Sequence, residues 1–155
     1  MRKRKPKIRA IEPDPRYQDT MVTMFVNNMM YSGKKGLAYN LFYGAMDIID
    51  EKEDEGGYEI WKKAIDAAMP QVEVRSRRIG GATFQIPTEI RPKRKLVTGM
   101  KWIIKFARQR NGKSFSEKLA AELMAAAKGE GAAVKRKDET HRMAESNRAF
   151  AHFRV

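Results

Sequence analysis

The side chains in this sequence that could do chemistry are mostly guanidinium and ammonium groups, and they gather in two stretches. Residues 1–10 hold six Lys and Arg without an acid, and residues 75–113 hold twelve against one acid, Glu89. Such groups bind phosphate, and an Arg can hold a phosphate through two parallel hydrogen bonds or stack on a base. Seven acids in residues 47–59 separate the two stretches, so charge is polarised along the chain. A basic face with an acidic back is typical of a polyanion binder.

A run of charge is more often a solvated surface than a binding site. Six cations within ten residues, however, repel one another unless a partner neutralises them, so we favour a bound polyanion. The formal net charge of +13 agrees with this interpretation. The predicted centre of the site is a strip of seven cations: Arg75, Arg77, Arg78, Arg91, Lys93, Arg94 and Lys95.

Residue type and spacing argue against other chemistry. The chain has no Cys, which excludes disulfides, thiol nucleophiles and thiolate zinc sites. Residues 33–35, Gly-Lys-Lys, resemble the end of a phosphate loop but follow a predicted helix and lack the upstream Gly and the Ser or Thr. His141 shares a predicted helical face with Asp138 and Glu145, yet no nucleophile is near, and with His152 it lacks a third zinc ligand. We expect a surface hydrogen-bonding His141, no cofactor, no metal, no small-molecule substrate and no enzymatic activity.

The chain has 155 residues, 42% of them hydrophobic and 33% charged, which is enough for one domain with a single core. No apolar run approaches the ~18 residues of a membrane span, and the first residues are charged where a signal peptide would be apolar. We therefore expect a cytoplasmic protein without a membrane partner.

Apolar residues recur at helical spacing in six segments. These segments are residues 22–30, 37–49, 61–68, 92–111, 114–129 and 132–147. Ser114 and Glu117 fit a capping box at the start of the fifth segment. The sixth segment is so polar that it must lie on the domain surface or be ordered by a ligand. Trp61 is expected in the core with Met21, Met24, Met29 and Met30, whereas Trp102 could anchor its helix or stack on a base, and we favour the anchor.

Between the third and fourth segments the apolar period falls to two, which predicts a β-hairpin at residues 72–90 with Gly80 and Gly81 in its turn. Strands of about eight residues make a ribbon roughly 26 Å long, so its tip should project. Because an isolated ribbon is marginally stable, we expect part of its stabilisation to come from a partner. Residues 1–18, with three Pro and no apolar period, read as an extended basic arm. The predicted fold is mainly α: a single-domain bundle of about six helices at residues 19–155 with a protruding hairpin. We expect the arm's first ~15 residues and the hairpin tip to be mobile without a bound ligand.

Four motifs resemble the bacterial-type small ribosomal subunit protein seven family. The first is the stretch from Asp19 to Ala45 with Gly-Lys-Lys between two apolar helices. The second and third are residues 70–87, PQVEVRSRRIGGATFQIP, and residues 89–92, EIRP, followed by Lys101 and Trp102. The fourth is residues 141–154, HRMAESNRAFAHFR, so the resemblance covers residues 10–154.

This resemblance implies a structural constituent of the ribosomal small subunit that is a primary binder of the 3′ major domain of 16S rRNA and nucleates assembly of the head. It also implies a position near the exit-site tRNA and the mRNA path, beside small-subunit protein eleven and other head proteins. The implied RNA contacts add to the strip the arm residues Arg2, Lys3, Arg4, Lys5, Lys7 and Arg9, then Lys34 and Lys35, and finally Arg142, Asn147 and Arg148. The predicted set is completed by helical cations, namely Lys101, Lys105, Arg108, Arg110, Lys113, Lys135, Arg136 and Lys137.

The sequence departs from that family at its end, where Val155 stands in place of a common Trp, and at Lys101, where Arg is common. An alternative from another class is a DNA-binding or nucleoid protein. The sequence contains no recognisable helix-turn-helix, zinc finger or basic zipper, and a finger with basic tails suits an irregular folded RNA better than a duplex groove.

Overall fold

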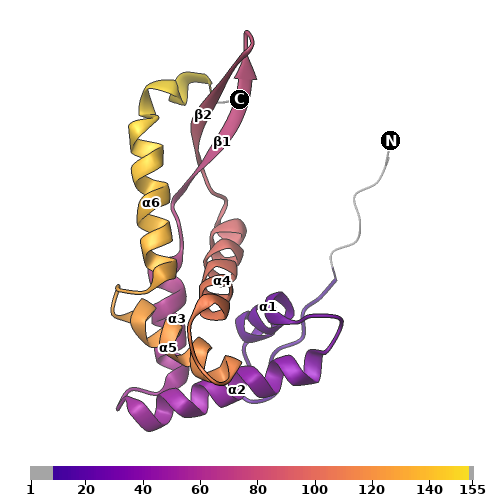
Figure 1. The fold of residues 1–155 in the computed structure, drawn as a ribbon. Coiled ribbons are helices and arrows are strands. Elements are labelled where there is room, and N and C mark those ends of the chain that lie inside the picture. Colours follow the sequence, from indigo (N-terminus) through magenta and orange to yellow (C-terminus); the bar gives the residue numbers. More distant parts are fainter. Residues whose placement is uncertain (1–8, 154–155) are drawn as a thin grey trace.

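The computed structural model describes residues 9–153, which form six α-helices, one β-hairpin and a short 3-10 helix (Figure 1). In chain order they are α1 (Thr20–Met29), α2 (Lys35–Lys52), α3 (Gly57–Ala68), β1 (Val72–Ile79), β2 (Ala82–Glu89), α4 (Pro92–Gln109), α5 (Phe115–Ala127), α6 (Ala132–Ser146) and η1 (Arg148–Phe153). The predicted mainly helical fold with a two-stranded hairpin is therefore confirmed. The sequence pattern does not predict η1. None of these helices is long and apolar enough to cross a lipid bilayer.

The core of the bundle is built around α5, which packs against α2, α3 and α4. Phe25 and Phe42 meet the Trp61 ring edge to face, with centroids 5.9 and 5.6 Å away, a geometry favoured by aromatic quadrupoles. Trp61 is fully buried, as predicted. Trp102 is half-buried against the same core, which supports its predicted role as an anchor. The four predicted core methionines lie in or against it: Met21, Met24, Met29 and Met30.

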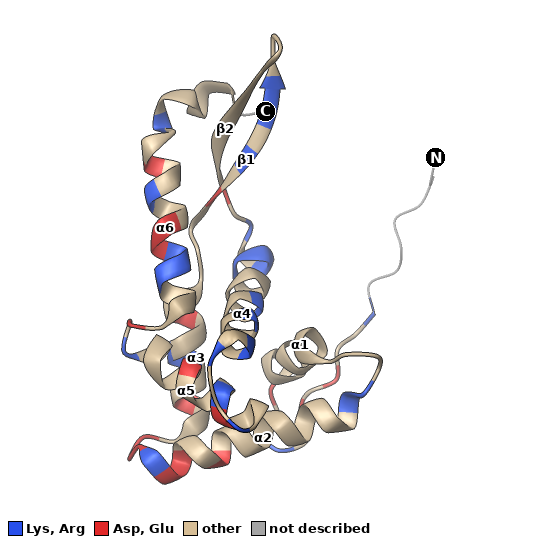
Figure 2. Ribbon diagram, in the orientation of Figure 1, with Lys and Arg blue, Asp and Glu red and all other residues tan. Residues whose placement is uncertain are grey.

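The polar helix α6 lies on the surface of the domain, which was one of its two predicted fates. It buries Ala133 and Val134 near its start and Thr140 and Ala144 farther along, and packs against α4 and β1. Most of its remaining positions are exposed, and these carry most of its charge (Figure 2). Small buried residues therefore suffice to dock a helix whose sequence is poor in apolar side chains.

A side-chain cap fixes the start of α5. The Ser114 hydroxyl accepts a hydrogen bond from the Glu117 N–H at 3.2 Å, as the predicted capping box requires. The return bond differs, because the Glu117 carboxylate accepts from the N–H of Lys113 at 3.1 Å and not from that of Ser114. The loop after α4 is thereby held against the first turn of α5.

The hairpin stands away from the bundle beside the upper half of α6 (Figure 1). Its strands pair antiparallel from Val72↔Glu89 to Ile79↔Ala82, and both turn residues, Gly80 and Gly81, have positive φ as predicted. Part of the support for the hairpin comes from the same chain, because α6 and η1 pack against the two strands. Stabilisation of the hairpin by an external partner stays a prediction. The sequence pattern misses this support because η1 shows no helical apolar period.

The predicted extended arm at residues 1–18 is wrong for its last five residues. The buried carboxylate of Asp14 accepts hydrogen bonds from the N–H groups of Arg16 and Tyr17 at 3.0 and 2.8 Å and from the Tyr43 hydroxyl at 2.5 Å. Burial and the bond to Asp14 raise the pKa of Tyr43 above its ordinary value. A turn at residues 15–17 is thus docked on α2, and a single polar side chain, which has no apolar signature, anchors it.

Candidate nucleic-acid interface

The cationic strip begins where the hairpin meets α4, and Glu73 organises it there. One oxygen of the Glu73 carboxylate accepts from Arg75 Nε at 2.7 Å, and the other accepts from Arg94 Nε at 2.9 Å. Burial by itself would raise the pKa of Glu73, but the hydrogen bonds from the two guanidinium groups outweigh it and hold that pKa below its usual range. The Glu73 side chain is only 16% exposed, whereas those of Arg75 and Arg94 are 63% and 59% exposed. Two guanidinium groups are therefore fixed at their inner edges and open to solvent at their outer edges.

A hollow lies beside this pair, between the base of the hairpin and the first turn of α4. Arg91, the N-cap of α4, and Pro92 at its first position form one wall. Arg75 of β1 and Arg94 of α4 both line the hollow, so cationic groups from a strand and a helix face the same space. The residues that line the hollow are Arg75, Thr88, Glu89, Ile90, Arg91, Pro92 and Arg94. The structure thus brings three of the seven strip cations, Arg75, Arg91 and Arg94, to one hollow. Lys95 follows on the same helix, where its Nζ donates to Gln71 Oε1.

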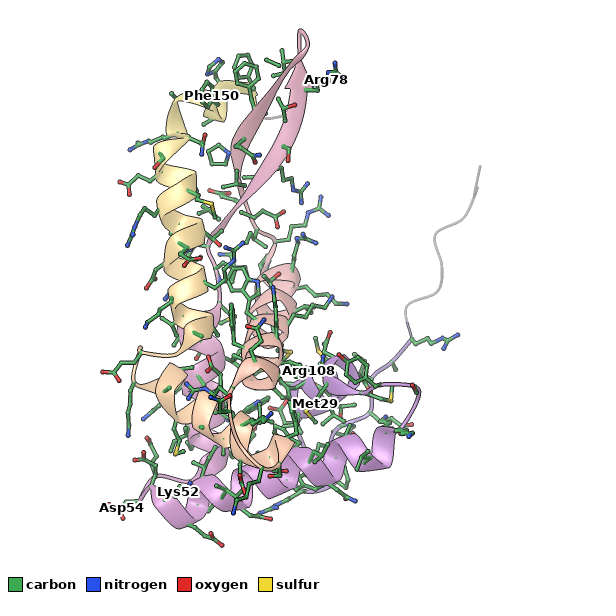
Figure 3. The ribbon with its side chains drawn as sticks, viewed as in Figure 1. Met29, Lys52, Asp54, Arg78, Arg108 and Phe150 are labelled. Atoms are coloured by element: carbon green, nitrogen blue, oxygen red, sulfur yellow. The ribbon has the colours of Figure 1, made fainter. Side chains whose placement is uncertain are left out.

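Farther along α4, Arg108 is positioned by the end of α1. Its Nη2 donates to the carbonyl of Met29 at 2.9 Å, and Figure 3 labels both residues. The Arg108 guanidinium also lies 4.0 Å from the centroid of the Tyr31 ring. The Tyr31 side chain remains 67% exposed. Sequence reasoning missed Tyr31, and its only signal there is a large aromatic residue between an apolar helix and a Gly-Lys-Lys loop.

Tyr31 and Arg108 separate two hollows of different character. The one of about 350 Å³ is mainly apolar, with Lys34 and Arg108 at its border. Its other lining residues are Met29, Met30, Tyr31, Leu37, Ala38, Leu41 and Phe115. The second hollow is more polar and is lined by Asn28, Tyr31, Lys101, Ile104, Lys105, Arg108 and Gln109. An apolar hollow with cations on its border can take the face of an unstacked base while its phosphate stays at the border.

Lys105 also lines a fourth hollow, together with exposed cations at the start of α6. Lys135 is exposed there, and Arg136 Nη1 donates to Glu139 at 3.2 Å. No side chain caps the start of α6, and its first turn holds no acid. The three cations lie around an opening lined by Lys105, Phe106, Ala132, Lys135, Arg136 and Glu139.

Two predicted RNA-binding cations, Arg110 and Lys137, bind groups on other helices of the protein. Arg110 Nε donates to the fully buried Glu122 at 2.5 Å, and the other Glu122 oxygen accepts from the Ala133 N–H at 3.0 Å. Lys137 donates to the carbonyl of Ala67 at 2.8 Å. These two cations join helices to one another, so their contact with RNA stays a prediction with a competing structural role.

The remaining predicted residues are distributed over the surface. Exposed side chains are those of Arg9, Lys34, Lys35, Lys113, Arg142 and Arg148, whereas Asn147 is half-buried and donates to the Met143 carbonyl at 2.7 Å as α6 ends. Arg2, Lys3, Arg4, Lys5, Lys7 and Val155 lie outside the described residues. The acids of residues 47–59 gather at the far end of α2 and the start of α3, where Figure 3 labels Lys52 and Asp54, so charge is also polarised in space (Figure 2).

His141 has the structural role that the sequence predicts. Its Nε2 accepts a hydrogen bond from the Gln71 N–H at 2.9 Å and so joins α6 to the start of β1. Among residues 9–153 there is no group of three or more His, Asp or Glu side chains that could hold a metal ion. The geometry of the described residues therefore offers cationic and aromatic surfaces for an anionic polymer.

The sequence was compared with known protein families and proteins. The sequence model of the family described as ribosomal protein S7p/S5e matches residues 1–148. The chain is 59% identical over 154 residues to small ribosomal subunit protein uS7 of Cytophaga hutchinsonii, covering 99% of each chain. It is 54% identical over 155 residues to the protein of the same name from Amoebophilus asiaticus, covering 100% of each, and 60% identical over 157 residues to that of Porphyromonas gingivalis, covering 99% of each.

Proposed function

The chain belongs to the ribosomal protein S7p/S5e family, and on that premise we propose that it binds the 3′ major domain of 16S rRNA directly and nucleates assembly of the small-subunit head. Members of this family are structural, non-enzymatic, RNA-binding components of the small ribosomal subunit and serve translation. Beyond this shared role of the family, we propose the RNA region that this chain binds, the side chains that bind it and the stage of assembly at which it acts.

The observation that carries the proposal is the Arg75–Glu73–Arg94 cluster at the base of the hairpin. A carboxylate held between two guanidinium groups fixes their direction before any ligand arrives, so less side-chain entropy is lost when phosphate binds. The hollow beside the cluster joins cations of β1 with those of α4, and a folded RNA with phosphates on two converging strands complements this shape. We assign the primary rRNA contact to Arg75, Arg78, Arg91, Lys93, Arg94 and Lys95.

A second contact is proposed along the far half of α4. Lys101, Lys105 and Arg108 supply phosphate contacts, and Tyr31 supplies a face on which a base can stack. Lys34 and Lys35 extend this contact across the loop before α2, and Lys135 and Arg136 extend it to α6. The projecting hairpin, whose tip carries two Gly and so exposes its backbone, is proposed to reach toward the exit-site tRNA, the mRNA path and small-subunit protein eleven.

The test is a salt titration of binding to an isolated 3′-domain rRNA fragment. Each phosphate contact contributes about 0.7 to 0.9 to the slope of log affinity against log salt. A double variant, Arg91→Ala with Lys93→Ala, should reduce the slope by roughly 1.4 to 1.8 because it removes two contacts. The matched control, Lys52→Ala with Lys63→Ala, removes the same charge from the acidic end of α2 and α3 and should leave the slope unchanged.

Two outcomes would contradict the proposal. Equal slopes for the two double variants would show that net charge alone sets affinity. Preference for plain duplex DNA over the rRNA fragment in a competition assay would favour the alternative of a DNA-binding protein.

A further inference from the structure

We infer that η1 is an intramolecular brace that fixes the direction of the hairpin, and that Arg77 is a positioning residue of this brace and not an RNA contact. The part that concerns RNA rests on the proposed function. The part that concerns the hairpin is a property of the free protein and can be tested without RNA.

The brace holds both members of one rung of the hairpin. Arg77 lies directly opposite Phe84 in the antiparallel ladder, and residues in such a pair share a face of the ribbon. Arg77 Nη1 donates to the carbonyl of Phe153 at 2.8 Å. The Phe84 ring lies 5.1 Å from that of Phe150 and 5.7 Å from that of Phe153, measured between centroids. A hydrogen bond and an aromatic cluster thus join the same six-residue segment to one rung.

The Arg77↔Phe84 pair is close to the hairpin tip, where a contact has the greatest effect on the direction of the hairpin. Only the pairs Arg78↔Thr83 and Ile79↔Ala82 lie between it and the turn. The opposite end of the ribbon is held by Glu73 to α4 and by the Gln71 N–H to His141 of α6. A ribbon held at one end pivots about it, whereas a ribbon held at both ends keeps one direction relative to the bundle.

The neighbouring Arg78 supplies the contrast within the strand. Successive side chains of a strand point to opposite faces, so Arg78 points away from the face that η1 covers. Figure 3 shows Arg78 and Phe150 on opposite sides of the hairpin. Arg77 and Arg78 are both exposed, but within residues 9–153 only Arg77 of the two has an acid or carbonyl partner for its side chain. Adjacent guanidinium groups therefore have different tasks: Arg77 holds the strand, and Arg78 is presented to a ligand.

The experiment compares Arg77→Met with Arg78→Met in the full chain. Met keeps much of the aliphatic stem at either position and removes the charge and the donors. In the free protein, Arg77→Met should raise amide hydrogen exchange in β1 and β2 about fivefold, as loss of one hydrogen bond predicts, and Arg78→Met should leave it unchanged. With the rRNA fragment, Arg78→Met should reduce the salt slope by about 0.7 to 0.9, and Arg77→Met should leave it unchanged.

Phe84→Ala tests the aromatic half of the brace independently. It should raise hairpin exchange as Arg77→Met does, and the double variant should raise it by less than the product of the two effects, because both act through η1. Unchanged exchange in Arg77→Met, or a salt slope reduced as far as in Arg78→Met, would overturn the assignment of Arg77. Amide hydrogen exchange is measured without RNA. The test of the brace therefore stays valid even if the rRNA proposal fails.

Discussion

The helical bundle and the hairpin are held in place by different forces. The bundle buries a continuous apolar core, with Phe25, Phe42 and Trp61 at its centre. In the hairpin, β1 has no buried residue and β2 has one, Ile86, so its placement depends on ion pairs, hydrogen bonds and a small aromatic cluster. Stability is therefore concentrated in the bundle, whereas the direction of the cations on the hairpin depends on a few polar contacts that can change without unfolding the domain.

The largest expected difference between the two regions is in the free energy of unfolding that a Phe→Ala substitution removes. Phe42→Ala removes a fully buried ring and should lower the free energy of unfolding by about 3 to 5 kcal/mol. Phe84→Ala removes a half-buried ring from the hairpin and should lower it by less than about 1 kcal/mol, because the bundle unfolds without reference to the brace. Urea denaturation followed by circular dichroism measures both values. Similar losses would show that hairpin and bundle unfold as one cooperative unit.

The second prediction concerns how much a buried ion pair contributes to the stability of the bundle. Glu122 is fully buried, and its partner Arg110 is 34% exposed. Glu122→Gln keeps an acceptor for the Ala133 N–H but removes the charge that Arg110 faces. Breaking a buried pair costs about 3 to 5 kcal/mol, and the partial exposure of Arg110 reduces the expected loss to roughly 2 kcal/mol. Glu130→Gln, an exposed acid in the loop after α5, is the matched control, and an equal loss in the two variants would refute the special role of Glu122.

The contrast between the regions also explains what the sequence predicts about the fold. Apolar spacing of 3.6 predicts the helices because the residues that form the core repeat along each of them. Alternation around Gly80 and Gly81 predicts the hairpin, although only Ile86 of its strands is buried. Elements anchored by single polar side chains leave no such period. The turn at residues 15–17 depends on the buried Asp14, and η1 depends on contacts with Phe84 and Arg77, about seventy residues away in the chain. Both were missed for that reason.

The candidate site was also predicted from the sequence only in part. Clustering of Lys and Arg predicts that the surface is cationic and where along the chain it lies. It does not predict which cations are held by the protein. Arg75, Arg77 and Arg110 all lie in the basic stretch of residues 75–113, but they bind Glu73, the Phe153 carbonyl and Glu122. Tyr31 was missed because it becomes part of the site only through Arg108, which lies on a helix distant in sequence.

The smallest expected effect is the response of the hairpin base to pH. The pKa of Glu73 is lowered in the folded protein from an ordinary value of 4.5, so the contact with Arg75 and Arg94 is complete at neutral pH and is lost as the pH falls through the folded pKa. A carboxyl carbon titration by NMR should give Glu73 a midpoint below 4.5, and Arg94→Met should move that midpoint upward because one of the two hydrogen bonds is removed. Backbone amide shifts of β1 and α4 should follow the same titration in the unmodified chain and lose it in Glu73→Gln, while those of the bundle core stay constant. A Glu73 midpoint at or above 4.5, unmoved by Arg94→Met, would mean that the carboxylate does not join the hairpin to α4. The two regions would then be connected by the chain at residues 69–71 and 90–91 and by α6 and η1, and the cations on either side of the hollow would approach RNA independently.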